Sequence, residues 1–167
     1  FLVIQNDQIK AEYYWDGYGP EDGGRSYKNS NSFSAAKSII SILIGAALQQ
    51  GYISSIDQKV SEFIDSFKDG MKADITIRDV LHMASGLDFM EAYNQPISDT
   101  TEAYYGKDLR ALVARLGIEE VPGTTWRYKS GDTQVLALVL EAATDKTVSQ
   151  FASEALWSKI GATEDAQ

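Results

Sequence analysis

Alternating apolar and polar residues at the start of the chain predict a β-hairpin. The runs FLVIQ (residues 1–5) and QIKAEYYW (residues 8–15) are strand-like, and Asn6-Asp7 between them suits a tight two-residue turn. Residues 16–31 are rich in glycine, asparagine, serine and proline, which predicts a surface loop. We therefore expect two antiparallel strands followed by a long loop.

Helical spacing of apolar residues dominates the rest of the chain. The most apolar predicted helix begins near Ser34, continues to about Gln50 and is stopped by Gly51. Thr76 and Asp79 have the spacing of an N-cap and its capping-box partner. The other predicted helices span residues 54–67, 76–86, 106–117, 131–144 and 147–160, whereas 88–105 are predicted to be irregular and 121–128 extended.

The predicted ratio of helix to sheet is unusual. A two-stranded hairpin is marginally stable alone, and several helices need a broad surface to pack on. We therefore expect further strands beyond Gln167. No repeat or low-complexity linker divides the chain, so residues 1–167 are predicted to form one partial domain of mixed helix and sheet.

Composition and charge narrow the function classes. The apolar content of 44% and charged content of 23% are those of an ordinary globular protein, and the net charge of −9 argues against nucleic acid as a partner. The chain has no cysteine, which excludes disulfides, thiolate catalysis and cysteine-based metal sites. Its longest apolar run, residues 39–48, is shorter than the roughly 20 residues of a membrane span, so none is predicted. Because the chain opens on Phe1 without a leader, we expect it to be part of a longer protein.

Ser34 and Lys37 lie at the start of the most apolar predicted helix. Residues three apart share a helix face, so the hydroxyl and the amine should meet in the first turn, where backbone N–H groups favour negative charge. A serine becomes nucleophilic when a base takes its proton, and a lysine can be that base if its neutral form is accessible. The structural alternative is that Ser34 only caps the helix while Lys37 extends into solvent.

Three sequence blocks carry a family resemblance. SFSAAKSIISILIGAALQQGYISSIDQKVSEFI (residues 32–64) resembles the first motif region of the serine β-lactamase-like and penicillin-binding-protein superfamily, which has an S-x-x-K nucleophile motif. ITIRDVLHMASGLDF (75–89) resembles the helix and SGL turn that come next. WRYKSGDTQVLALVLEAATDKTVSQFASEALWSKIGA (126–162) resembles the Y-x-[SN] motif and its helix pair. Within this superfamily, the sequence is most similar to the branch of class C β-lactamases, carboxylesterases and 6-aminohexanoate-dimer hydrolases.

The resemblance implies roles for four residues. Ser34 matches the acylated nucleophile and Lys37 its proton-transfer partner, whereas Tyr128 matches the second general base. Ser130 stands where the family has a Ser or Asn that lines the substrate site. No cofactor and no metal are predicted.

Other residues compete for these roles. Tyr27 and Tyr52 also begin Y-x-[SN] tripeptides, but Tyr128 follows PGTTW and precedes an amphipathic helix, as the family's tyrosine does. His82, the single histidine, is predicted to be a partly buried structural residue rather than a member of a triad. Two further features stay open: a possible carboxylate pair, and aromatic residues that would line a cleft or cover the core (Asp88 and Glu91; Tyr93, Tyr104 and Tyr105).

The resemblance also implies a fold and a function. The expected fold is α/β (α+β), β-lactamase/transpeptidase-like, with an antiparallel sheet flanked by helices plus a helical region. It would be incomplete at the C-terminus, because the family's third motif, K-T-G or H-x-G, is expected after Gln167. The expected function is a serine hydrolase that cleaves an ester, amide or β-lactam bond of a small molecule through an acyl-enzyme on Ser34, with a slight tilt toward esterase or amidase. The alternative is a catalytically silent ligand-binding or sensor domain.

Two expectations concern partners and location. The missing C-terminal segment of the same protein is a predicted partner, and residues 1–167 alone are predicted to be weakly active or inactive. No signal peptide is visible, and a periplasmic or secreted location is favoured over a cytoplasmic one.

Overall fold

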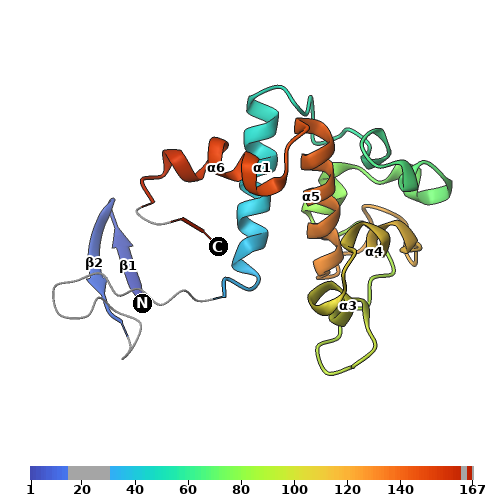
Figure 1. Cartoon of the computed structure of the whole chain (residues 1–167), viewed down its shortest axis with the longest axis horizontal. Helices are drawn as coiled ribbons and strands as arrows, with labels where there is room; N and C mark the ends of the chain where they lie inside the picture. Colours follow the sequence, from blue (N-terminus) through green and yellow to red (C-terminus); the bar gives the residue numbers. More distant parts are fainter. Residues whose placement is uncertain (15–30, 163–164, 167) are drawn as a thin grey trace. The chain divides into compact units, whose positions relative to one another are not determined.

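A computed structural model describes residues 1–14, 31–162 and 165–166 of the chain (Figure 1). The chain divides into two compact units, Phe1–Phe33 and Ser34–Gln167. The first contains a hairpin and the second contains the helices.

The hairpin consists of β1 (Leu2–Gln5) and β2 (Gln8–Glu12), which pair antiparallel. Asn6 and Asp7 have φ angles of 52° and 57°, the positive values that a two-residue turn of type I′ requires. The predicted hairpin and its turn are therefore confirmed, although β2 ends before the predicted limit. All strand residues are exposed within this unit.

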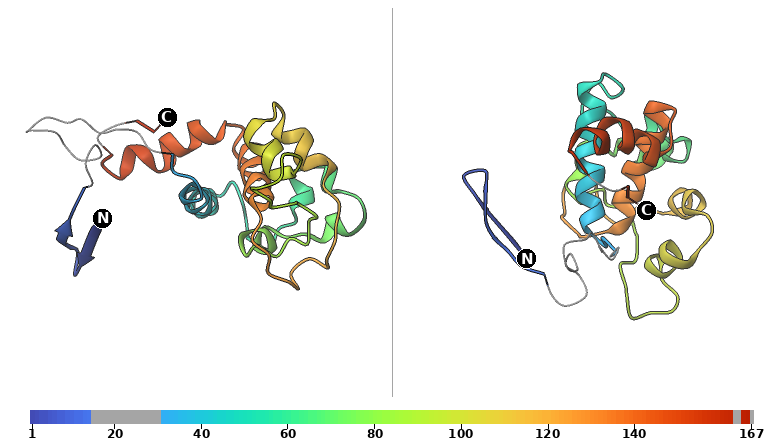
Figure 2. Two further views of the ribbon diagram at one scale, coloured as in Figure 1. Left: turned by 90° about the horizontal axis from the view of Figure 1, so that it is seen from below. Right: turned by 60° about the vertical axis from the view of Figure 1, so that its left-hand side comes forward.

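Two long helices, α1 (Ala35–Gln49) and α5 (Ser130–Thr144), pack against each other and form the centre of the helical unit (Figures 1 and 2). Both present an apolar stripe to the core because their buried residues recur at helical spacing. The buried apolar residues are Leu43, Ile44 and Ala47 of α1 and Val135, Leu136, Val139 and Leu140 of α5. Gly51, with a φ of 77°, follows the end of α1 as predicted.

Shorter elements surround this pair. Each of three helices has a side-chain N-cap: Ser98 caps α3 (Asp99–Tyr105), Asp108 caps α4 (Leu109–Arg115) and Thr147 caps α6 (Val148–Ala155). The 3₁₀ turns are Val60–Glu62, Asp65–Phe67, Gly70–Asp74 and Trp157–Lys159. Among the described residues, no helix combines the length and the apolar character needed to cross a bilayer.

The helix predicted at residues 54–67 is wrong, because the backbone of this segment bonds elsewhere. The Val60 N–H donates to the Ile75 carbonyl at 2.9 Å, and the Ile77 N–H donates to the Gln58 carbonyl at 3.0 Å. These bonds hold the chain extended near residue 59 and leave only two 3₁₀ turns. The inward residues were predicted correctly, since Val60 and Phe67 are fully buried.

Two other helix boundaries also differ from prediction. Helix α2 (Ile77–Leu81) has the predicted capping box of Thr76 and Asp79, but it ends at Leu81 because Met83 adopts a φ of 55°. Helix α3 lies in a stretch predicted to be irregular. Its signal was the cap at Ser98 followed by acidic residues in the first turn, a pattern that favours a helix start.

Candidate active site

Ser34 immediately precedes α1, and its hydroxyl does not cap that helix. Its Oγ instead accepts a hydrogen bond from the Tyr128 hydroxyl at 2.7 Å and one from the Lys37 Nζ at 3.3 Å. Tyr128 is 94 residues away in sequence and belongs to a different segment. The structure therefore brings three of the predicted site residues together at one hydroxyl oxygen, and the capping alternative for Ser34 has no geometric support.

Lys37 contacts both of the other residues. The Lys37 backbone N–H donates to the Ser34 carbonyl at 3.0 Å, which places its side chain on the same face of the first turn. Its Nζ also lies 5.1 Å from the centre of the Tyr128 ring, within the range of a cation–π interaction. Ser34 and Tyr128 are exposed, so a small molecule can reach the hydroxyl.

The backbone around Lys129, the residue before α5, determines where the side chains of the Y-x-S segment point. Lys129 is extended, with φ −140° and ψ 124°, and alternate side chains of an extended segment point to opposite sides. Lys129 is buried and its Nζ donates to the Leu87 carbonyl and to Glu119 Oε1, the latter at 2.7 Å. Tyr128, by contrast, is turned toward Ser34.

Ser130 is bound by a carboxylate from a distant loop. The Ser130 backbone N–H donates to Glu91 Oε2 at 2.6 Å, and its hydroxyl donates to Glu91 Oε1 at 2.8 Å. The Tyr93 hydroxyl also donates to Glu91, and this bond raises the pKa of Tyr93 to about 12. Ser130 is thus near Tyr128 in the chain, but its hydroxyl proton is directed to Glu91.

Asp132 lies fully buried in the first turn of α5. Its Oδ1 accepts a hydrogen bond from the Ser85 hydroxyl at 2.6 Å, whereas its Oδ2 is buried with no hydrogen-bond partner among the described residues. Burial raises the pKa of Asp132 to about 6, because an apolar environment disfavours the charged carboxylate.

A cavity of about 440 Å³ adjoins Tyr128. It is polar and aromatic in character, and Trp126 at its edge is 68% exposed. Among the described residues, no group of three histidine, aspartate or glutamate side chains is arranged to hold a metal ion. The residues that line the cavity are Phe89, Glu91, Glu119, Trp126, Arg127, Tyr128 and Lys129.

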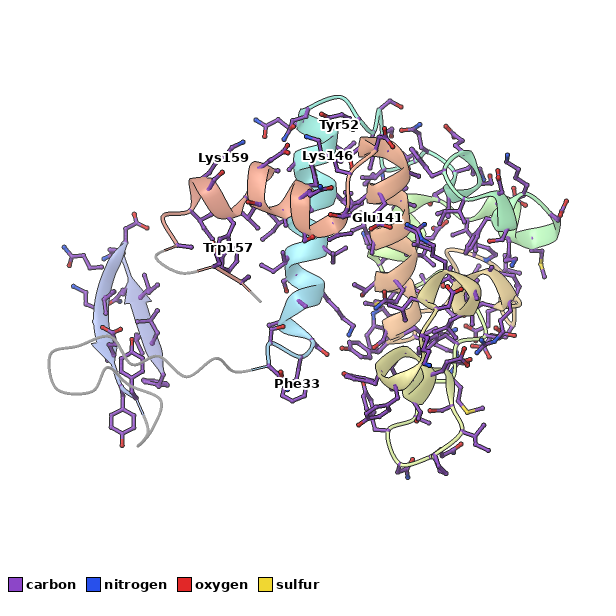
Figure 3. All side chains as sticks on the ribbon, in the orientation of Figure 1. Phe33, Tyr52, Glu141, Lys146, Trp157 and Lys159 are labelled. Atoms are coloured by element: carbon purple, nitrogen blue, oxygen red, sulfur yellow. The ribbon has the colours of Figure 1, made fainter. Side chains whose placement is uncertain are left out.

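Of the two competing tyrosines, Tyr52 lies within the described residues and does not contact Ser34. Tyr52 lies past the C-terminal end of α1 (Figure 3), roughly 20 Å along the helix from Ser34, and its ring packs edge-on against Phe151. Tyr27 lies outside the described residues.

The structure also places the single histidine, the possible carboxylate pair and the three tyrosines that were considered from the sequence. His82 is exposed, so the prediction of a partly buried histidine is wrong; it is the C-cap residue of α2. Asp88 and Glu91 are not a pair, because Asp88 Oδ1 accepts from the Gly117 N–H at 2.7 Å while Glu91 binds Ser130. The aromatic residues do not cover the core, since their exposed fractions are 65% for Tyr93, 56% for Tyr104 and 84% for Tyr105.

Sequence reasoning missed the contacts that hold the segment next to Tyr128, including those of Glu91, which was considered only as a possible pair with Asp88. Glu91, Ser85 and Lys129 make their contacts across 39, 47 and 42 residues of chain, which no local spacing reveals. One signal was available for Asp132. An acidic residue in the first turn of an amphipathic helix is usually exposed, and here the periodicity of α5 places it on the apolar face.

Comparison with solved structures defines the fold. The chain is similar to the protein named "Putative 6-aminohexanoate-dimer hydrolase" from Bacillus anthracis, with a TM-score of 0.75 and 20% identity over 96% of this chain and 44% of that one. It is also similar to a penicillin binding protein from Bacillus halodurans, with a TM-score of 0.58 and 20% identity over 72% of this chain and 38% of that one. At this identity the likeness shows the fold, which is β-lactamase-like as predicted.

Sequence comparison identifies the family. The family model described as Beta-lactamase matches residues 1–166, and the chain belongs to this family. It is 27% identical to the 6-aminohexanoate-dimer hydrolase of Paenarthrobacter ureafaciens over 99% of this chain and 43% of that protein. It is 23% identical to an uncharacterized protein of Alkalihalophilus pseudofirmus over 92% of this chain and 39% of that protein. The chain thus spans less than half the length of these relatives, and the predicted resemblance is confirmed.

Proposed function

We propose that the protein containing this chain is a serine hydrolase that cleaves an ester, amide or β-lactam bond through an acyl-enzyme on Ser34. The observation that supports it most is the meeting of Lys37 and Tyr128 at the Ser34 hydroxyl, at 3.3 Å and 2.7 Å. Two groups that can carry a proton are therefore in contact with one exposed nucleophile.

The proposed reaction assigns each proton to a contact that is present. As Ser34 Oγ attacks the substrate carbonyl carbon, its proton passes to Lys37 or Tyr128 in its deprotonated form, and the hydrogen bond between Ser34 and that group reverses its direction. Tyr128 then delivers a proton to the leaving amine or alcohol as its bond to the carbonyl carbon breaks. In the second half, water attacks the acyl-enzyme and gives up a proton to the same groups. They return a proton to Ser34 Oγ as its bond to the acyl carbon breaks and the acid is released.

The substrate class follows from relatives and from the site together. The relative from Paenarthrobacter ureafaciens is named as a hydrolase of 6-aminohexanoate dimer, which directs the first substrate test to amides of small amino acids. The cavity beside Tyr128 contains both carboxylates and aromatic rings, which suits a small polar substrate. We propose ester or amide cleavage ahead of β-lactam cleavage.

A turnover experiment separates the enzyme from a silent binding or sensor domain. The full-length protein should release p-nitrophenol from p-nitrophenyl acetate over many cycles, and Ser34→Ala should reduce the rate to the background. A protein that binds the ester or becomes acylated once without turnover would support the sensor alternative. Unchanged turnover in Ser34→Ala would overturn the assignment of the nucleophile.

A further inference from the structure

The first turn of α5 is held residue by residue by the segment 85–91. The four contacts are of different kinds. In the first, a lysine ammonium donates to a backbone carbonyl. In the second, a carboxylate accepts from a serine hydroxyl and its N–H; in the third, a glycine packs closely on an aromatic ring; and in the fourth, another carboxylate accepts from a serine hydroxyl. The close packing involves a glycine, because a Cβ at Gly131 would lie only 2.5 Å from a ring carbon of Phe89. The paired residues are Lys129 with Leu87, Ser130 with Glu91, Gly131 with Phe89, and Asp132 with Ser85.

Glu91 supplies the cap that α5 lacks locally. Lys129 stands at the N-cap position and its side chain makes no capping bond. Glu91 replaces it from 39 residues away, with one oxygen on the Ser130 N–H and the other on the Ser130 hydroxyl. A carboxylate at a helix N-terminus is favoured by the helix dipole as well as by these bonds.

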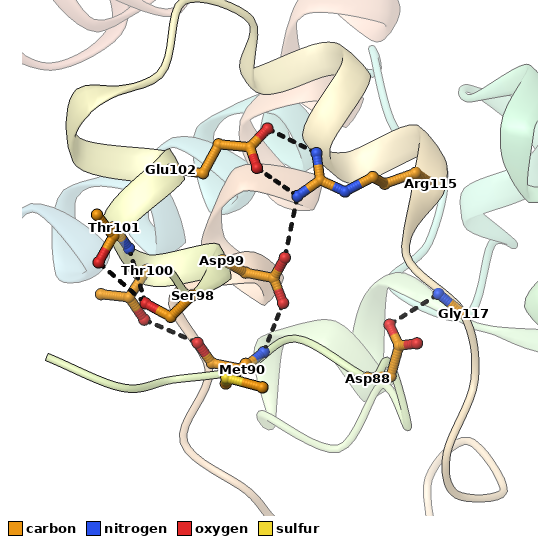
Figure 4. Close-up of polar contacts among 9 residues, drawn as sticks. All are labelled: Asp88, Met90, Ser98, Asp99, Thr100, Thr101, Glu102, Arg115 and Gly117. Atoms are coloured by element: carbon orange, nitrogen blue, oxygen red, sulfur yellow. Dashed lines mark hydrogen bonds and ion pairs between the residues drawn. The ribbon is translucent and has the colours of Figure 1, made fainter. Parts of the chain in front are cut away.

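Helix α3 fixes the backbone on both sides of Glu91, and Figure 4 shows the contacts on the Met90 side. The Met90 N–H donates to Asp99 Oδ2 at 2.8 Å, and the Thr100 hydroxyl donates to the Met90 carbonyl at 3.0 Å. On the other side, the Ala92 N–H donates to Thr100 Oγ1 at 3.0 Å. Asp99 is held in turn by Arg115 at 3.1 Å. Glu91 is therefore presented to α5 by a segment whose backbone has little freedom.

We propose that Glu91 is a positioning residue that holds Tyr128 against Ser34; this proposal rests on the proposed function. Tyr128 lies two residues before Ser130, and the residue is 39% exposed, so packing alone does not fix it. Its place depends on the backbone that follows, which Glu91 anchors at two atoms of Ser130. A glutamine could not replace this carboxylate, because it has one acceptor oxygen for the two Ser130 donors and the Tyr93 hydroxyl.

The test measures how fast a fluorophosphonate labels Ser34 in the full-length protein. Displacement of a catalytic group by about 1 Å costs up to roughly 100-fold, so Glu91→Gln should slow labelling roughly 10- to 100-fold. In a Tyr128→Phe background, Glu91→Gln should cause no further slowing, because its effect passes through the Tyr128 hydroxyl. Glu62→Gln is the matched control: Glu62 also accepts a backbone N–H, from Lys59, but at a 3₁₀ turn, and its labelling rate should stay at the wild-type value.

The outcomes distinguish this proposal from the proposed function. Labelling of Glu91→Gln at the wild-type rate, or an equal slowing in the Tyr128→Phe background, would overturn the positioning role while leaving Ser34 as nucleophile. Absence of label on wild-type Ser34 would overturn the proposed function instead. Should Glu91→Gln not fold, Glu91→Asp keeps the charge but shortens the reach by one methylene, and it should show the same dependence on Tyr128.

Discussion

The Ser34 hydroxyl is contacted by two side chains that can each move a proton, and this contact yields the first prediction. Proton transfer by a placed side chain is worth roughly 10²–10⁴-fold in rate. Lys37→Ala and Tyr128→Phe should each lower kcat of the full-length protein by that factor while its circular dichroism spectrum stays unchanged. Tyr52→Phe is the control, because Tyr52 lies at the other end of α1. Full activity in Tyr128→Phe would mean that another residue moves the proton.

His82 gives a prediction of the opposite kind. Because its side chain is exposed, His82→Gln should change neither kcat by more than about twofold nor the free energy of unfolding by more than about 0.5 kcal/mol. Steady-state kinetics and urea denaturation check both values. A larger loss of activity would indicate that His82 takes part in catalysis.

These residues show what a motif can and cannot predict. Ser34 and Lys37 share one helical turn, so their spacing suggested them as candidates, whereas Tyr128 and Ser130 were selected through the family resemblance. The contacts of Glu91 and Ser85 could not be predicted, because their partners become neighbours only when the segment 85–91 packs on α5. His82 was misjudged since nothing in its local sequence shows that α2 ends before it.

The turn that contains Gly86 depends on the absence of a side chain. Gly86 has a φ of 76°, and a Cβ there would overlap the Glu120 carbonyl oxygen; Gly51 has a φ of 77° but open space around it. Gly51→Ala should therefore cost about 1–2 kcal/mol of backbone strain. Gly86→Ala should cost about 1–3 kcal/mol more, because the overlap adds to the strain. Urea denaturation of both variants measures the difference, and equal losses would show that the 85–91 segment shifts without cost.

The buried carboxylate in α5 predicts how stability depends on pH. The folded-state pKa of Asp132, about 6, lies above the unfolded value, so the folded state holds the proton more tightly. Its contribution to stability is complete below about pH 4 and is lost as the pH rises through about 6, by about 3 kcal/mol in total.

Asp132→Asn isolates this effect because asparagine does not ionise. The free energy of unfolding of the variant, minus that of the wild type, should rise by about 3 kcal/mol between about pH 4 and pH 7. Taking the difference removes the titration of other groups, such as Glu120, whose pKa is lowered by its hydrogen bond from Arg127. A difference that does not vary with pH would show that the pKa of Asp132 is the same in the folded and unfolded states.

Elements were predictable where their signals are local. The capping box at Thr76 and the Asn6-Asp7 turn need only neighbouring residues, and both are present in the structure. The segment 54–67 has helical spacing of apolar residues, but its backbone bonds to residues 75–77 and forms turns. The sequence alone does not show whether a segment with helical spacing will form a helix or will bond its backbone to a distant segment.

The two compact units of the chain should differ in local stability. All residues of β1 and β2 are exposed, and a two-stranded hairpin without a packed face is marginally stable. In the 167-residue chain, amides of residues 2–12 should exchange with solvent much faster than those of Leu43–Ala47 and Val135–Leu140 in the core. Hydrogen–deuterium exchange with mass spectrometry measures both, and equal protection of the hairpin and the core would show that another surface covers the strands.

The identity of the nucleophile is tested most directly by mass spectrometry of the full-length protein after reaction with a fluorophosphonate probe. We expect one probe per molecule, located on the peptide that contains Ser34, and no label in Ser34→Ala. Ser34 should react because the residue is exposed in the described part of the chain and its hydroxyl contacts Lys37 and Tyr128. A probe found on another serine, with Ser34 unmodified, would contradict the account.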